Sequence, residues 1–273
     1  MRRLIFCALG AACSASVFAQ ATAQSIVNGD VVYTVNANAY TGANTASGGS
    51  ANFRVAGAAG TDHFFRDMWA YRLDGHTREF MVRDAGATVN FSGSVGTVDV
   101  NQAADGLGFR LTFQVIDPDG AAQNQGLLVT RMRVVNVGST VRTVNLFNYV
   151  DCDVNGTGTG DVGAVTTNGN ARNYSVTDVN TLNAVAYGTS HWYNNVLILG
   201  NFTDTDIDDF NDSAANVGPV DLAIGAQWTF DLAPDSFREI TMGYAINATP
   251  VPEPATMAAL GLGVAAMLRR RRK

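Results

Sequence analysis

Residues 127–150 read LLVTRMRVVNVGSTVRTVNLFNYV and carry the clearest strand pattern in the chain. Apolar and β-branched residues alternate with polar ones over 127–135 and again over 140–150. One face of the second run is formed by Val141, Thr143, Asn145, Phe147 and Tyr149. Residues 136–139 between the runs have the chemistry of a turn. This pattern predicts two antiparallel strands joined as a hairpin.

The same kind of pattern recurs along the rest of the chain. Residues 227–232 and 237–246 flank a turn at 233–236, which predicts a second hairpin, and 108–116 and 173–179 have strand chemistry. Convincing amphipathic helix is absent from the sequence between the two ends. Short strands at roughly ten-residue spacing predict an all-β fold, an antiparallel β-sandwich. No linker or internal repeat divides residues 24–250, so we expect one exported β-sandwich domain there.

The N-terminal residues have the three parts of a secretory signal. Arg2 and Arg3 are the charged part, residues 4–18 are apolar or small, and small-x-small sites end at Ala19 and Ala23. We therefore expect a signal peptide over 1–23, exported by the secretory route and removed by signal peptidase. The mature body would then be residues 24–250.

The C-terminal residues form a second ordered signal. Pro252 and Pro254 keep the segment around Glu253 extended, so an enzyme can bind it as a strand. An apolar run follows, and the chain ends in five cations that stay cytoplasmic by the positive-inside rule, Arg269, Arg270, Arg271, Arg272 and Lys273. A helix over 255–268 is short for a bilayer core of about 30 Å, so we expect a short transmembrane helix that acts as a transient stop.

This tail resembles the PEP-CTERM sorting signal of Gram-negative bacteria over residues 251–273. The resemblance implies processing by an exosortase that recognises Pro252, Glu253 and Pro254, with the five terminal cations as the membrane stop. It implies an inner-membrane-anchored precursor and then a cell-surface or extracellular protein, in a setting of extracellular polysaccharide and biofilm. The same tail is sometimes labelled the C-terminal domain of ice-binding proteins, which describes the tail and not an activity of the body.

Charge and cysteine content narrow the partners of the body. The chain has 18 Lys and Arg and 24 Asp and Glu residues. Seven of the cations and Glu253 lie in the two ends, so the body keeps 11 basic and 23 acidic residues and a net charge near −12. Such a body is not expected to bind nucleic acid or anionic lipid. Its single cysteine, Cys152, cannot form an internal disulfide and is expected to be buried.

A loop after the predicted strand 140–150 suggests the one cofactor that we consider, calcium. Oxygen ligands at alternate positions followed by Gly156 resemble the first half of a calcium-binding loop. The candidate ligands are Asp151, Asp153, Asn155 and Asp161. The twelfth position is Val162, where such a loop has a glutamate. The alternative is a solvated loop that binds no metal.

A second acidic group lies at Asp204, Asp206, Asp208, Asp209 and Asp212. These carboxylates repel one another unless they are solvated or bridged by a cation. The alternative to a cation site is an exposed acidic loop.

The sequence contains no motif typical of catalysis. His63, His76 and His191 lie beside aromatic residues, but their spacing matches no metal, nucleophile or phosphate motif. We therefore expect no enzyme but an exported surface or extracellular-matrix protein, associated with exopolysaccharide. The alternative is a secreted carbohydrate-binding module or carbohydrate-active enzyme that uses His63, His76 and the aromatic residues near them.

Overall fold

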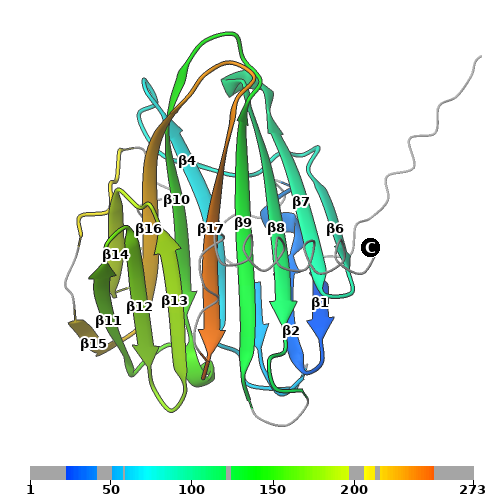
Figure 1. Cartoon of the computed structure of the whole chain (residues 1–273), viewed down its shortest axis with the longest axis vertical. Helices are drawn as coiled ribbons and strands as arrows, with labels where there is room; N and C mark the ends of the chain where they lie inside the picture. Colours follow the sequence, from blue (N-terminus) through cyan, green and yellow to red (C-terminus); the bar gives the residue numbers. More distant parts are fainter. Residues whose placement is uncertain are drawn as a thin grey trace, which may run out of the picture.

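The computed structural model describes residues 23–41, 51–57, 59–120, 124–196, 206–212 and 216–248, and these form an antiparallel β-sandwich (Figure 1). The predicted all-β sandwich is thereby confirmed. Helix within these ranges is limited to three single 3-10 turns, η1 (Ala37–Ala39), η2 (Ala103–Asp105) and η3 (Val154–Gly156). No helix in the described ranges has the length and apolar character to cross a membrane. Residues 1–22 of the expected signal peptide and the whole tail 251–273 lie outside these ranges.

One layer of the sandwich is a nine-stranded sheet in the order β15-β11-β12-β13-β17-β9-β8-β7-β6. All of its neighbouring pairs are antiparallel. Its strands are β6 (Thr88–Ser92), β7 (Val95–Gln102), β8 (Leu107–Ile116), β9 (Gly126–Asn136), β11 (Asp161–Asn168), β12 (Ala171–Thr177), β13 (Thr181–Tyr187), β15 (Asn216–Val220) and β17 (Phe237–Ile246).

The other layer consists of two smaller sheets behind the nine-stranded one (Figure 1). The five-stranded sheet has the order β14-β16-β10-β4-β5, and the three-stranded sheet has the order β1-β2-β3. Their strands are β1 (Ala23–Asn28), β2 (Val31–Asn36), β3 (Ala51–Arg54), β4 (Phe64–Leu73), β5 (Phe80–Met81), β10 (Arg142–Cys152), β14 (His191–Val196) and β16 (Leu222–Leu232). The backbone N–H of His63 donates to the carbonyl of Phe53, which places β3 beside the start of β4.

Alternation of side chains builds the core between the layers. In β8 every second residue from Leu107 to Val115 is buried, as expected for a strand with one face on a core. β10 is different because it is buried on both faces from Val144 onward. Its inward residues join the main core, and its outward residues Phe147 and Tyr149 pack in a second cluster with Phe210. A strand that is covered on both faces is a central strand of the fold, because an isolated hairpin on a core would leave one face exposed to solvent.

Both predicted hairpins are wrong in their pairing, although the strands exist. β9 pairs with β8 and β17 in the nine-stranded sheet, whereas β10 pairs with β16 and β4 in the five-stranded sheet. The second predicted hairpin is divided in the same way, because β16 and β17 lie in different sheets. Each turn is therefore an arch that carries the chain from one layer to the other, and the two arches lie side by side.

Asn136 ties the two arches together. Its side chain is fully buried, and its Nδ2 donates to the carbonyls of Thr140 at 2.8 Å and Leu232 at 2.9 Å. Its Oδ1 accepts the N–H of Gly138 at 2.9 Å. Its own backbone N–H donates to the carbonyl of Ser236. One asparagine thus satisfies polar groups of both turns, including the buried Leu232 carbonyl.

A polar network crosses the core and links the two layers. Tyr33 on β2 and Asn148 on β10 donate to the two carboxylate oxygens of Asp67 on β4, at 3.0 and 2.8 Å. Tyr244 on β17 donates to the Asn148 Oδ1 at 2.7 Å. All four side chains are buried. Burial raises the pKa of Asp67 to about 6, and these two hydrogen bonds only partly oppose that effect.

Candidate metal centre

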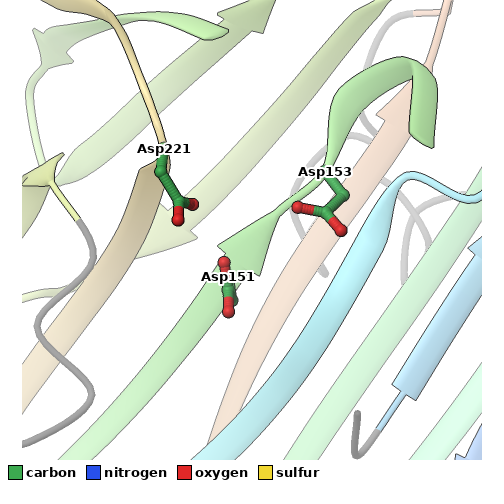
Figure 2. Close-up of side chains that lie close together, drawn as sticks. All are labelled: Asp151, Asp153 and Asp221. Carbon is green, nitrogen blue, oxygen red and sulfur yellow. The ribbon is translucent and has the colours of Figure 1, made fainter. Parts of the chain in front are cut away.

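Three aspartates meet at one end of the five-stranded sheet (Figure 2). Asp151 is the second-last residue of β10, Asp153 follows that strand, and Asp221 immediately precedes β16. One carboxylate oxygen from each lies within 4.8 Å of the others. In the close-up the three side chains extend toward a shared space between the two strands. Within the described ranges this is the only group of three or more acidic, histidine or cysteine side chains with metal-binding spacing.

The strand pairing explains why these residues meet. β10 and β16 run antiparallel, with Cys152 opposite Leu222 and Asp151 opposite Ala223. The last residues of β10 and the first of β16 therefore lie at the same edge of the sheet. The chain then turns at η3 and returns over the group at Gly158. A Cβ atom on Gly158 would lie 3.2 Å from the Asp153 Oδ1, so the residue has little room for a side chain.

Within the described ranges, no hydrogen bond or ion pair satisfies the three carboxylates. Asp151 is 2% exposed, and Asp153 and Asp221 are half-buried. None of the three carboxylates forms a hydrogen bond or ion pair with any residue that the structure describes. Buried carboxylates normally accept several hydrogen bonds, so this group has an unmet need for donors or a cation.

The electrostatics follow from that arrangement. Burial is the main reason that the pKa of Asp151 rises to about 7, and the charges of Asp221 and Asp153 add to it. The guanidinium of Arg66 acts in the opposite direction. Burial also raises the pKa of Asp153 and of Asp221. In the absence of a cation the group therefore resists holding all of its negative charge.

Asp161 lies on the inner side of the same region. It is the first residue of β11, is fully buried, and neither of its carboxylate oxygens has a hydrogen-bond partner. Burial raises its pKa to about 7, and the charges of Asp178, Asp153 and Asp221 contribute. The backbone N–H of Val154 lowers that pKa but does not reach hydrogen-bond geometry. Asp161 is thus a buried carboxylate whose strand partner, Val220, is the residue before Asp221.

The candidate ligands read from the sequence are arranged differently from a calcium loop of the helix-loop-helix type. Asp151 and Asp153 are in the group, and Asp161 approaches it from β11. Asn155 has a left-handed backbone, φ 69°, and its Oδ1 accepts a hydrogen bond from the Asn180 Nδ2 at 3.2 Å. Val162 is 46% exposed. Sequence reasoning missed Asp221, because only the pairing of β10 with β16 brings it there.

The histidines do not share a site. His63 and His76 lie at opposite ends of β4, roughly 30 Å apart at about 3.3 Å per residue. His63 is fully buried, accepts the Asn155 N–H at its Nδ1, and has a pKa lowered by burial to about 4. His191 is exposed on β14 and pairs with Asp212. A single active site containing both His63 and His76 is therefore not formed.

The aromatic residues near His76 pack against one another. The His76 ring lies 4.7 Å from the Phe80 ring, and the Arg78 guanidinium lies 5.1 Å from the centre of that ring. His76 Nε2 and the hydroxyl of Tyr71 both hydrogen-bond to Asp105. Phe80 is 36% exposed, but its neighbours already cover part of its ring.

The second acidic group serves to hold a loop. Asp204 lies outside the described residues. The Asp209 Oδ1 accepts hydrogen bonds from Arg72 at 2.8 Å and from Gln227 at 2.7 Å, and Arg72 also pairs with the buried Glu79. The Asp212 Oδ1 accepts the backbone N–H of Trp192 at 2.9 Å. Asp209 and Asp212 bond to different partners, and no three of the described members of this group come within metal-binding spacing of one another.

Comparison with known proteins identifies the tail. Residues 250–273 match the family model of the PEP-CTERM protein-sorting motif, which confirms the resemblance inferred from the sequence. The motif implies an exported protein whose membrane-anchored precursor is processed by an exosortase, a membrane-associated enzyme. No curated protein sequence matches this chain.

Among solved structures, the chain is similar to a bacterial glucoamylase complexed with acarbose, with 13% identity, a TM-score of 0.49, and coverage of 86% of this chain and 32% of the glucoamylase. A polysaccharide lyase has 11% identity, a TM-score of 0.46 and coverage of 83% and 34%. An aldose epimerase homologue from C. elegans has 10% identity, a TM-score of 0.47 and coverage of 84% and 99%. This chain spans about one third of the glucoamylase and of the lyase.

Proposed function

We propose that this chain is a non-catalytic protein of the cell surface or extracellular matrix, delivered there by exosortase processing of its tail. The observation that carries the proposal is the sorting motif at residues 250–273. It follows a large β-sandwich whose acidic body suits a soluble exported protein. The signal expected at residues 1–23 would bring the chain to the membrane where the exosortase acts.

The arrangement of reactive side chains supports a non-catalytic body. A general acid or base must reach the proton that it transfers, and its pKa must suit the working pH. His63 is sealed from solvent and its pKa is depressed to about 4. The charged residues Arg72, Glu79 and Asp209 are engaged with one another in holding the 206–212 segment. These groups have structural partners in place of a substrate.

The proposed setting is the extracellular polysaccharide that accompanies this kind of sorting signal. A body with a net charge near −12 repels other polyanions, so any contact with acidic polysaccharide would run through cations or through neutral sugars. If the processed body is held by the polysaccharide in this way, removal of the polysaccharide from intact cells should release the body into the medium. A body that remains on polysaccharide-free cells would argue for attachment to the membrane or to another protein.

Cell fractionation tests delivery. We expect the parent chain to reach the outside of the cell, and the variant Glu253→Ala to accumulate as an unprocessed membrane-bound precursor. The control is Glu239→Ala, which removes one glutamate from β17 in the body and should leave sorting unchanged. Equal export of the Glu253→Ala variant and the parent chain would refute exosortase delivery. Turnover of polysaccharide or peptide by the purified protein would refute the non-catalytic assignment.

A further inference from the structure

We propose that Asp151, Asp153 and Asp221 bind calcium, with the buried Asp161 as an inner ligand or charge partner, and that the site fills once the body is outside the cell. The filling outside the cell rests on the export proposed above. The binding itself rests only on the geometry of the four aspartates.

The three carboxylates have no hydrogen-bond or ion-pair partner among the residues that the structure describes. Three carboxylates with oxygens within 4.8 Å of one another repel strongly if all are charged, and protonating them costs free energy at neutral pH. Asp151 is almost completely buried, so water alone cannot solvate it fully. A divalent cation between the three oxygens removes the repulsion and supplies each oxygen with a partner.

Asp161 is a fourth aspartate at this edge, and it belongs to a different strand, β11. It is fully buried, and both of its carboxylate oxygens lack a hydrogen-bond partner among the described residues. Its register partner on β15 is Val220, the residue directly before Asp221. Unpartnered buried carboxylates are rare in folded proteins and call for an ion or ordered water. Asp161 and Asp151 therefore point independently to a cation at the same edge.

The ligand chemistry selects a hard cation. The group offers only carboxylate oxygens. The two softer ligands nearby, Cys152 and His63, are not within metal-binding spacing of the three carboxylates. The Cys152 thiol lies in the main core, and the His63 Nδ1 accepts the Asn155 N–H. Oxygen ligands favour calcium or magnesium over zinc and copper. Calcium accepts irregular sets of six to eight oxygens, including water, whereas magnesium demands a near-ideal octahedron. Side chains from two strand ends and a turn fit the less demanding ion.

The location of the site suggests a role in stabilising the fold. Asp151 and Asp153 belong to the end of β10, Asp161 to the start of β11, and Asp221 to the connection between β15 and β16. A cation held by these residues joins the five-stranded sheet to the nine-stranded one at this edge. Calcium sites of extracellular modules bind with dissociation constants of about 0.1 to 1 mM, so they load where calcium is plentiful. The exported body would thus gain its full stability outside the cell.

Calorimetric titration and thermal unfolding of the full chain test the proposal. In the parent protein, calcium at about 1 mM should raise the melting temperature above its value in a chelator, and the same concentration of magnesium should raise it less. The variant Asp221→Asn should weaken calcium affinity by at least about 100-fold. The matched control, Asp231→Asn, removes the same charge from the other end of β16 and should bind calcium like the parent.

The variant has a second signature that does not depend on binding. In the chelator, Asp221→Asn should melt at the same temperature as the parent or higher, because it relieves repulsion among the carboxylates. With calcium present, the variant should have a lower melting temperature than the parent protein. A parent melting temperature that does not respond to calcium, or an Asp221→Asn variant that keeps the parent affinity, would overturn the site. Equal responses to calcium and magnesium would overturn the assignment to calcium.

Failure of the site and failure of export are separate results. Calcium binding by a chain that stays inside the cell would support the site, but it would refute the proposal that the site fills after export. Export of a chain that does not bind calcium would refute the calcium site, but it would not contradict the proposed function.

Discussion

Asp151 and Asp221 are distant in the sequence, yet one carboxylate oxygen of each lies within 4.8 Å of the other. Neither carboxylate has a partner that would explain the approach among the residues described. Their proximity follows from the antiparallel pairing of β10 with β16, which places the end of one strand beside the start of the other. The candidate site is therefore a property of the sheet and not of one loop.

The stability of the arches should depend on Asn136. The variant Asn136→Ala leaves the Leu232 carbonyl without that partner in a buried region, and the Thr140 carbonyl and the Gly138 N–H without it in a partly buried one. We expect a loss of about 2 to 4 kcal/mol in the free energy of unfolding, measured by urea denaturation. Asn90→Ala, at an exposed position on β6, should cost no more than about 0.5 kcal/mol. Equal small effects would contradict the role assigned to Asn136.

The turn that begins at Asn136 shows what the sequence could and could not predict. Alternation located the strands 127–135 and 140–150 well, because period-two patterning is a local signal. It did not determine their partners, since a turn of four residues fits a hairpin and an arch equally. Burial of both faces of β10 decides the matter, and that burial comes from the main core on one side and from the cluster with Phe210 on the other.

The candidate site was predictable in part for the same reason. Asp151 and Asp153 are close in sequence, and their spacing carried a signal for a metal ligand. Asp161 is a candidate ligand of the same predicted loop, and it reaches the region as the first residue of β11. Asp221 has no local pattern around it. Its role depends on a pairing between distant strands, which one sequence does not reveal.

The buried carboxyl of Asp67 should make stability depend on pH. Burial raises its pKa from 3.8 to about 6 in the folded chain, so its stabilising contribution is complete below about pH 4. That contribution is lost as the pH rises through about 6, to a total of about 3 kcal/mol. Tyr33, Tyr40, Tyr244 and Asn148 face Asp67, and none of these four side chains is a cation.

Unfolding of Asp67→Asn tests this dependence. In a chelator, the difference in unfolding free energy between the parent and Asp67→Asn should change by about 3 kcal/mol between about pH 4 and about pH 7, in the direction that favours the variant at neutral pH. Asp231→Asn, whose carboxyl is exposed, should show no such change. A constant difference across this range would show that Asp67 ionises normally in the folded state.

The segment 206–212 should depend on Glu79. Arg72 lies between Glu79 and Asp209, and the Glu79 carboxylate also accepts the backbone N–H of Asp208. Glu79→Gln should cost about 3 kcal/mol, at the low end for a broken buried ion pair because Asp209 still faces the guanidinium. It should also speed proteolysis within 206–212.

The matched control for Glu79 is an exposed ion pair. Asp99→Asn breaks the pair between Asp99 and Arg110 on β7 and β8, and should cost less than about 1 kcal/mol. If Glu79→Gln cost no more than this control and left proteolysis unchanged, the 206–212 segment would be held by its apolar contacts alone.

The thiol of Cys152 should be unreactive in the folded protein. Its thiol is fully buried, and burial followed by the charges of Asp161, Asp151 and Asp153 raises its pKa. Because the thiolate is the reactive form, an aromatic disulfide reagent should react with the chain only after denaturation. Rapid reaction of the native protein would mean that the edge carrying the aspartate group opens in solution.

The most direct test of the whole account is the intact mass of the body recovered from outside the cell. Exosortase delivery predicts a mass that lacks the apolar run and the five terminal cations, together with the N-terminal residues 1–23. Recovery of an external protein that still carries the complete tail to Lys273 would contradict the account.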